Sequence, residues 1–253
     1  GDTMVLATAT MNPVVREGGD FLPLTVDYEE RFSAAGKILG SRFIKRETRP
    51  SEEAILVMRL IDRTIRPRFD MRVRNEVQVV VTALSIDEDN DPDMPALLAS
   101  SLALSLSDIP WDGPVAGVRV GRKDGKFILN PTYPERLETD MDVAVSGTGE
   151  KINMLEAGAK EVSEDDFVSA VEWGFKYVKE FVQFQEKIIS ENRKEKVVIS
   201  LTQIPEDLLT LIKKDFSGKI EEATYQKDKK TRNAKTSEVK KECAWHWALK
   251  NWM

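Results

Sequence analysis

Alternating hydrophobic and polar residues, together with short valine-rich runs, predict a series of β-strands. The alternation is clearest from Phe21 to Tyr28, and the apolar runs are typical of strands buried on both faces. The expected strands are Met4–Ala9, Phe21–Tyr28, Val77–Ile86, Val115–Gly121, Lys126–Leu129, Met141–Ser146 and Ile152–Glu156. Asp124-Gly125 lies between two of them and favours a tight hairpin turn.

A period close to 3.6 residues predicts helices between these strands. One apolar stripe consists of Ala54, Met58, Ile61 and Ile65, and we expect Ser51 to cap this helix and Pro67 to end it. Further helices are expected over Ala96–Ser107, from the capping sequence that starts at Ser163 to about Ile189, and from Pro205 to Gly218.

These elements predict an α/β body with a mixed sheet and packed helices, followed by a small all-α segment. The change in character comes after residue 191, and polar residues with partly helical spacing continue to residue 242. The last eleven residues, CAWHWALKNWM, hold three of the five tryptophans, the single cysteine and the single histidine. A frameshifted or readthrough end explains this atypical tail, and a genuine aromatic anchor is the alternative.

Composition narrows the possible chemistry. The chain has 253 residues, a mean hydropathy of −0.36 and no apolar run long enough to span a membrane, so we expect no membrane partner. Cys243 excludes an internal disulfide and is consistent with a reducing, cytoplasmic location. The single histidine, His246, lies near the C-terminus. We therefore expect neither a Ser-His-Asp triad nor a His/Cys zinc site elsewhere in the chain.

The net charge is −6, but the charge is unevenly distributed along the chain. The stretch from Arg42 to Arg74 contains ten lysines and arginines and five acidic residues, a local net charge of +5. The remainder of the chain therefore carries −11. Local potential decides where a polyanion binds. The stretch RFIKRETRP, Arg42 to Pro50, follows Gly36 and Gly40 and is expected to be a loop that presents cations beside one large aromatic.

The helix after this loop carries Arg59, Arg63 and Arg66 on one face, away from the apolar stripe. A solvated face, paired with Asp62 and nearby glutamates, is the simpler interpretation. The alternative is a continuous basic surface in which guanidinium groups bind phosphates and Phe43 stacks on an unpaired base. The proximity of loop and helix favours single-stranded nucleic acid as the ligand.

Several motifs resemble, in order and spacing, the first half of the bacterial polynucleotide phosphorylase family. They are GDTMVLATAT, DFLPLTVDYEE, AAGKILGSRFIKRETRPSE, RLIDRTIRP, NEVQVVVTALSID, DNDPD, SDIPWDGPVAGVRVG, ILNPT and MLEAGAKE. The resemblance implies a first ribonuclease PH-type core over residues 1–191, with its N-terminal strands missing, a partial all-α linker domain over 192–242 and the tail over 243–253. It also implies a homotrimeric ring that degrades RNA from the 3′ end, with Mg²⁺ and inorganic phosphate as cofactors of the parent enzyme.

The family's loop at this position narrows a central pore around single-stranded RNA with two aromatics and two arginines. Phe43 and Arg46 match this pattern, whereas Ile44 replaces an aromatic and Lys45 an arginine, so we expect a weaker grip on RNA. The residues predicted to bind RNA are Phe43, Ile44, Lys45, Arg46, Arg49, Arg59, Arg63 and Arg66.

The same resemblance predicts an empty active site. Active cores of this type hold metal with two aspartates six residues apart, and the corresponding positions, counted back from Asp140-Met141-Asp142, are Asn130 and Arg136. Active cores bind phosphate with small hydroxyl residues before a helix, where this chain has Asp91-Pro92-Asp93. We therefore expect no catalytic and no metal-binding residues here. Helix capping is the expected role of Asp91 and Asp93, and Asp140 and Asp142 are expected to be ordinary surface carboxylates.

The resulting hypothesis is the N-terminal part of a phosphate-dependent 3′–5′ exoribonuclease of mRNA degradation, which guides RNA and builds the ring while a second core, absent here, catalyses. This fragment alone is expected to be inactive and to hold neither Mg²⁺ nor phosphate. A non-enzymatic RNA-binding or scaffold module is the alternative, and a stand-alone phosphorolytic enzyme is disfavoured by Asn130 and Arg136. Partners in a larger RNA-degradation assembly follow from the family alone.

Overall fold

The computed structural model describes residues 1–15, 19–38, 49–199, 201 and 203–252. The strands are β1 Met4–Val15, β2 Leu24–Glu30, β3 Asn75–Ser85, β4 Ala116–Lys123, β5 Lys126–Leu129, β6 Met141–Gly147 and β7 Ile152–Ala159. The helices are α1 Glu52–Ile65, α2 Asp93–Leu106, α3 Tyr133–Glu138, α4 Glu164–Asn192, α5 Glu206–Leu211, α6 Ser217–Thr224 and α7 Lys229–Trp252, with a π-helical turn at Ile212–Phe216. The chain divides into two compact units, Gly1–Leu201 and Thr202–Met253.

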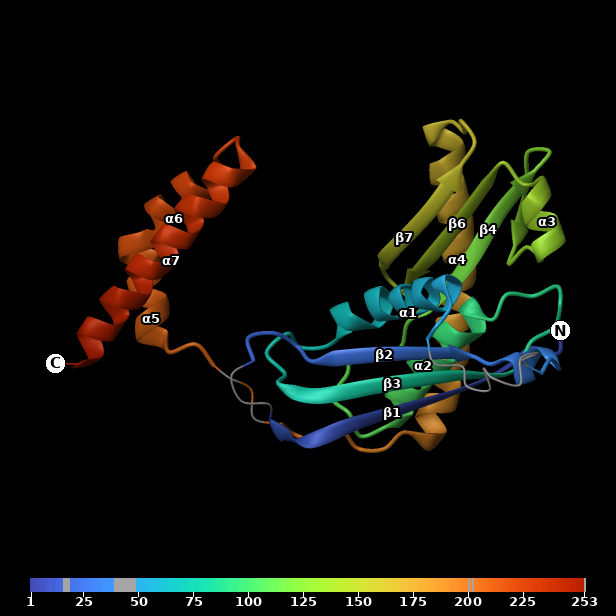
Figure 1. Cartoon of the computed structure of the whole chain (residues 1–253), viewed down its shortest axis with the longest axis horizontal. Coiled ribbons are helices and arrows are strands. Elements are labelled where there is room, and N and C mark those ends of the chain that lie inside the picture. Colours follow the sequence, from blue (N-terminus) through green and yellow to red (C-terminus); the bar gives the residue numbers. More distant parts are fainter. Residues whose placement is uncertain (16–18, 39–48, 200, 202, 253) are drawn as a thin grey trace. The chain divides into compact units, whose positions relative to one another are not determined.

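The first unit contains a three-stranded sheet in the order β1-β3-β2, in which β3 is central (Figure 1). β1 pairs with β3 antiparallel and β2 pairs with it parallel, so this sheet is mixed. Alternate residues of β3, including Val77, Val79 and Val81, are buried against a core that α1 and α2 complete. The helix α1 contacts β2, and α2 contacts β1.

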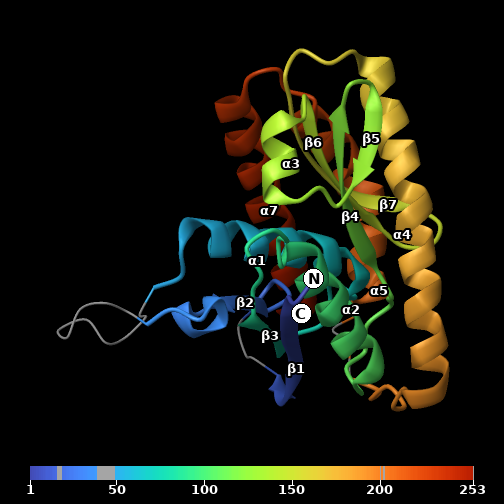
Figure 2. The same cartoon turned by 90° about the vertical axis from the view of Figure 1, so that its right-hand side faces the viewer.

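The second sheet of this unit has the order β5-β4-β6-β7 and is antiparallel throughout. The turn between β4 and β5 has positive φ at both Asp124 and Gly125, as the tight hairpin requires. The long helix α4 runs along this sheet and contacts β4 and β6 (Figure 2). Gly174 lets α4 approach closely, because a Cβ there would lie 2.7 Å from Val120 Cγ2.

The predicted α/β class is confirmed, with several corrections. The mixed pairing is confined to the first sheet, and a second, antiparallel sheet was not foreseen. The helix capped by Ser51 is confirmed, because Ser51 Oγ accepts a hydrogen bond of 3.0 Å from the Ala54 amide. Gly218 does not end a helix: it lies inside α6, in open space, and the helical backbone continues to Thr224.

An extended segment, residues 193–199, follows α4 and fastens the C-terminal end of α2. The amides of Lys194 and Val197 donate to the carbonyls of Leu106 and Asp108. Lys196 Nζ donates to the carbonyls of three residues at that end of α2, Leu104, Ser105 and Ser107, at 2.8, 3.2 and 2.7 Å. An ammonium group stabilises a helix at its C-terminus, where carbonyls lack intrahelical partners. We call residues 193–199 the strap.

The second unit is all helical. The composition break at residue 243 has no counterpart in the backbone, because α7 continues through it to Trp252. The His246 ring meets Phe216 edge-on at a centroid distance of 5.8 Å. Within the residues that the structure describes, no helix is long and apolar enough to cross a membrane. The assignment of residues 192–242 to a linker domain stays a prediction.

The close approach at Gly174 generates the first prediction. Gly174→Ala should destabilise the chain by about 1–3 kcal/mol, because the added methyl group overpacks a filled interface. Urea denaturation followed by circular dichroism measures this. The matched control is Gly218→Ala, which also adds a methyl group to a helix but meets nothing within 4 Å, so it should stabilise slightly. Equal effects of the two substitutions would contradict the packing account.

Candidate functional site

Two regions of the first unit contain the residues that the sequence singled out: the basic segment around α1, and a cavity at the N-terminal end of α2. Of the eight residues predicted to bind RNA, Phe43, Ile44, Lys45 and Arg46 lie outside the described residues. The other four are placed by the structure, and their surroundings differ.

Arg49 is exposed and lies at the edge of a cavity of about 270 Å³ between β2 and the start of α1. Three carboxylates, those of Asp27, Glu29 and Glu30, also line this cavity. Glu29 is paired with Arg31 at 2.7 Å. An acidic lining disfavours phosphate, so the cavity itself is a poor site for RNA, although Arg49 at its edge is accessible.

The solvent-facing side of α1 carries Ile55, Leu56, Arg59 and Arg63, which we call the outer face of α1. Leu56, Arg59 and Arg63 share one side because they are spaced by three and four residues. Arg59 is exposed, and no hydrogen bond or ion pair joins it to any other described residue. Arg63 forms an exposed ion pair of 3.3 Å with Glu156 of β7. Such a pair is weak in water, so a phosphate can compete for Arg63.

Arg66 was predicted to belong to the basic surface, but its side chain is bound within the fold. Its guanidinium donates to Asp62 at 2.6 and 3.0 Å and to the carbonyls of Leu22 and Leu24 at 3.2 and 3.0 Å. These bonds use all three nitrogens and anchor the segment before β2 to the end of α1. Arg66 is therefore not available to bind a phosphate in this arrangement.

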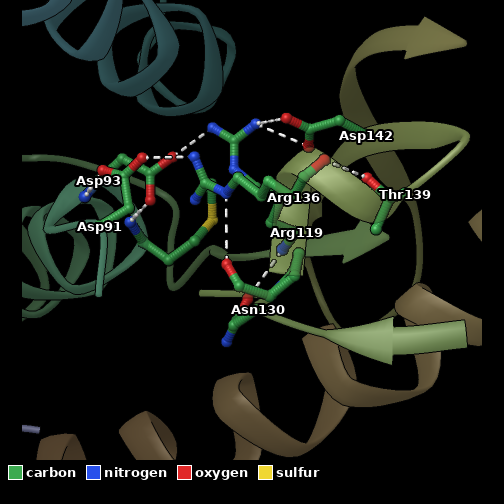
Figure 3. A network of polar contacts seen from close by, with 9 residues as sticks. Asp91, Asp93, Arg119, Asn130, Arg136, Thr139 and Asp142 are labelled. Atoms are coloured by element: carbon green, nitrogen blue, oxygen red, sulfur yellow. Dashed lines mark hydrogen bonds and ion pairs between the residues drawn. The ribbon is translucent and has the colours of Figure 1, made fainter. Parts of the chain in front are cut away.

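The second region is a cavity of about 180 Å³ where α2, β4 and α3 meet, and a network of charged side chains crosses it (Figure 3). Arg119 of β4 is the centre of this network. Its guanidinium is paired with the buried carboxylate of Asp93, at the start of α2, and with Asp142 of β6 at 2.8 and 2.9 Å. One arginine thus connects a helix of the first half of this unit with two strands of the second sheet.

A second ion pair closes the other side of the cavity. Arg136 of α3 donates to Asp91 Oδ2 at 2.8 Å and to the Pro131 carbonyl at 3.2 Å. Its guanidinium carbon lies 5.3 Å from the centroid of the Tyr133 ring, over which it is stacked. The position that the family resemblance assigns to a metal-binding aspartate is thus occupied by a cation held in place by a carboxylate.

Asn130 serves the backbone of the hairpin. Its φ is 46°, a left-handed conformation that Asn tolerates better than most residues, and its Oδ1 accepts a hydrogen bond of 2.8 Å from the Arg119 amide. The Asn130 amide in turn donates to the Arg119 carbonyl at 2.7 Å. The side-chain oxygen that a metal would need is therefore already an acceptor within the fold.

Burial and pairing set the ionisation of this network. Burial raises the pKa of the Asp93 carboxyl above its ordinary value, while the Arg119 guanidinium opposes that effect. Burial alone would lower the pKa of Arg119, but the carboxylates of Asp93 and Asp142 outweigh it and raise that pKa. The pair keeps Arg119 charged, and Asp93 depends on Arg119 to remain an anion.

The structure gives each of the four aspartates an arginine partner that the sequence did not indicate. Asp91 Oδ1 does accept from the Asp93 amide at 3.0 Å, as a capping role requires, but each of these two carboxylates also forms an ion pair. Asp140 and Asp142 are partly exposed, as surface carboxylates are, and Arg122 and Arg119 bind them. Arg119 was missed: a single arginine on a strand gives no periodic signal, and its partners are distant in sequence.

The chain matches the models of the 3′ exoribonuclease family, domain 1 over residues 1–110 and domain 2 over residues 113–177. It is 48% identical over 242 residues to the polyribonucleotide nucleotidyltransferase of Heliobacterium modesticaldum, covering 96% of this chain and 34% of that relative. The corresponding protein of Enterococcus faecalis is 47% identical over 240 residues, with 95% and 34% covered. The chain thus spans about a third of the length of the curated relatives that it matches.

The fold is also similar to a solved structure, rice Rrp46, with a TM-score of 0.60 at 16% sequence identity. The match covers 75% of this chain and 85% of the rice chain. At this level of identity the likeness concerns the fold alone.

The dependence of Asp93 on Arg119 generates the second prediction. Arg119→Met should lower the free energy of unfolding by about 3–5 kcal/mol near neutral pH, because a buried carboxylate loses its counter-charge. The deficit should shrink as the pH is lowered from neutral toward the ordinary pKa of an aspartate, since folding raises the pKa of the Asp93 carboxyl and protonation removes its uncompensated buried charge. Denaturant unfolding at several pH values measures both effects.

The matched control is Arg122→Met. Arg122 also binds two carboxylates, Asp140 and Asp166, but both are partly exposed to solvent and can ionise without it. This variant should lose less stability, and its deficit should stay constant from neutral pH down to the ordinary pKa of an aspartate and shrink only below it, because Arg122 lowers the pKa of Asp140 and Asp166. A deficit of Arg119→Met that stays constant with pH would contradict the assigned role of Asp93.

Proposed function

The chain belongs to the 3′ exoribonuclease family, and from this premise we propose that it is a non-catalytic, RNA-guiding core of a phosphate-dependent 3′–5′ exoribonuclease. The observation that carries this proposal is the ion-pair network of Arg119 and Arg136 with Asp91, Asp93 and Asp142. It occupies the cavity to which the family resemblance assigns catalysis.

The cavity is unsuited to inorganic phosphate. A helix N-terminus binds anions through its free amides, but the first amides of α2 are already engaged by its own carboxylates. The Asp93 amide donates to Asp91 and the Met94 amide to Asp93 Oδ1, while Pro92 has no amide hydrogen. A phosphate would meet two carboxylates and, among the first residues of α2, no vacant backbone amide.

The residues present do not fit a divalent metal either. Hard cations such as Mg²⁺ take oxygen ligands, mainly carboxylates. At the two positions in question the chain has Asn130, whose oxygen is bonded to a backbone amide, and the cation Arg136. Among the described residues no group of three or more His, Cys, Asp or Glu could hold a metal. No catalytic step is therefore assigned to this cavity.

The outer face of α1 supplies a surface for single-stranded RNA. Arg59 is unpaired among the residues described, and Arg63 gives up only an exposed ion pair on binding a phosphate. Ile55 and Leu56 beside them are 45% and 59% exposed, so bases can pack against apolar groups next to these cations. The sequence before α1 adds two further cations and one aromatic, Lys45, Arg46 and Phe43.

In the complete enzyme we propose that this core belongs to a cytoplasmic homotrimeric ring of mRNA degradation. Its role is to guide RNA, while a second core binds Mg²⁺ and phosphate and cleaves the 3′-terminal phosphodiester. The names of the curated relatives support a nucleotidyltransferase. The chain itself contributes binding and assembly.

The third prediction separates binding from catalysis. A labelled single-stranded oligoadenylate should bind this chain, and no ADP should appear when phosphate and Mg²⁺ are added. Lys45→Ala/Arg46→Ala should weaken binding without unfolding the chain. Binding by fluorescence anisotropy and ADP by chromatography are measured on the same samples. Phosphate-dependent ADP release that persists through purification would overturn the non-catalytic assignment.

The fourth prediction concerns α1. Arg59→Gln should weaken oligoadenylate binding and reduce the slope of log affinity against log salt concentration by about 0.7, the value for one lost phosphate contact on a single strand. Arg193→Gln is the control, because Arg193 is an exposed arginine outside the basic segment. If both variants behave like the parent chain, RNA does not bind along α1.

A further inference from the structure

The outer face of α1 meets a carboxylate of the second sheet, that of Glu156 on β7. Glu156 Oε2 lies 3.3 Å from Arg63 Nη1, and the two side chains are 51% and 50% exposed. The strand β7 contacts α1 and lies at the edge of its sheet (Figure 1). The arginine that a phosphate would contact on this face thus already has an acidic partner within the chain.

The strand directs Glu156 toward α1. Met154 and Glu156 are two residues apart on β7, so their side chains point to the same face of the sheet. Met154 is buried in the core to which α1 contributes its apolar stripe, whereas Glu156 is exposed. Opposite Glu156 in β6 is Ala144, another buried residue of that core. The carboxylate therefore lies at the rim of the core, on the side of the sheet that α1 covers.

Two hydrogen bonds beside the ion pair fasten α1 to the second sheet. Asn153 Nδ2 of β7 donates to the Thr64 carbonyl at 2.8 Å. The Thr64 hydroxyl lies 3.0 Å from the hydroxyl of Ser146 in β6, and both are buried. Thr64 directly follows Arg63, and Asn153 precedes Glu156 by three residues. Because the two backbones are held together here, the ion pair can break and form again without movement of the helix or the strand.

The three arginines predicted for this surface differ in what a phosphate must displace. Arg59 has no hydrogen-bond or ion-pair partner among the residues that the structure describes, so a phosphate displaces none of them. Arg66 is bound to Asp62 and to two backbone carbonyls and is not available. Arg63 is the intermediate case. A phosphate binds it only after Glu156 has released it, and Glu156 then stays beside the strand as a like charge.

We propose that Glu156 is a positioning residue that competes with RNA phosphates for Arg63 and thereby limits how tightly the outer face of α1 holds a strand. The inference rests on the proposed RNA-guiding function and adds a regulating residue to it. Carboxylate and phosphate oxygens are both acceptors for a guanidinium group, so one can replace the other. A surface that guides a moving strand needs contacts that release readily, and Glu156 takes Arg63 back as each phosphate leaves.

The test is Glu156→Gln, which removes the competing charge and keeps the size of the side chain. Oligoadenylate should bind this variant about two- to fivefold more tightly at low salt, because an exposed ion pair no longer has to be broken. The slope of log affinity against log salt concentration should become steeper by about 0.7, the value for one phosphate contact on a single strand. Fluorescence anisotropy at several salt concentrations measures both. A merely structural role of Glu156 would weaken binding and leave the slope unchanged.

Glu172→Gln is the matched control, because Glu172 is an exposed glutamate of α4, outside the outer face of α1. It removes the same charge from the chain and measures the general effect of net charge on RNA binding, which should be small. A double-mutant cycle then isolates the contact. In an Arg63→Gln background, Glu156→Gln should have no larger effect than Glu172→Gln, because the competition acts through Arg63.

Failure of this inference and failure of the proposed function give different results. If oligoadenylate does not bind the parent chain, or if Arg59→Gln leaves binding unchanged, RNA is not guided along α1 and both are wrong. If Arg59→Gln weakens binding but Glu156→Gln neither tightens it nor steepens the salt dependence, the inference alone is overturned. An equal gain from Glu156→Gln with and without Arg63 would also overturn it, because Glu156 would then act by general repulsion of RNA.

Discussion

A buried carboxylate requires a counter-charge, and in the first unit Arg119 supplies it to Asp93. Asp93 belongs to the part of the chain that matches domain 1 of the family, and Arg119 and Asp142 belong to the part that matches domain 2. The pair therefore holds α2 against the second sheet across the boundary of the two domains. Another buried contact crosses the same boundary, the hydrogen bond of 3.0 Å between the hydroxyls of Thr64 and Ser146.

This use of charge has a chemical consequence. The groups that could bind an anion or a metal at the start of α2 are consumed in holding the two domains together. Asp91 and Asp93 form ion pairs with arginines and accept hydrogen bonds from helix amides, and Asn130 accepts a hydrogen bond from an amide of the hairpin. Ligand binding here would have to replace these bonds. The outer face of α1 differs, because Arg59 and Arg63 contribute little to the fold and are available to a ligand.

Features that depend on neighbours along the chain were predictable from the sequence. The cap at Ser51, the buried stripe of α1 and the turn at Asp124-Gly125 follow from local hydrogen bonding, periodicity and backbone conformation. Features that depend on distant partners were not. Arg66 shares a helix face with Arg59, yet it binds the carbonyls of Leu22 and Leu24, more than forty residues earlier. Arg119 likewise finds its partners across α2 and β6, which no local pattern shows.

The strap also determines where a pulling force on the C-terminal helices enters the first unit. The helical unit begins at Thr202, shortly after the strap, so tension applied to that unit enters the first unit through the Lys196 ammonium group and the carbonyls at the end of α2. The three hydrogen bonds of this ammonium group hold the strap to the end of α2 like a clamp. The force would then reach α4 only after this clamp had failed, so the long helix and the sheet that it covers are shielded from a pull on the C-terminal helices.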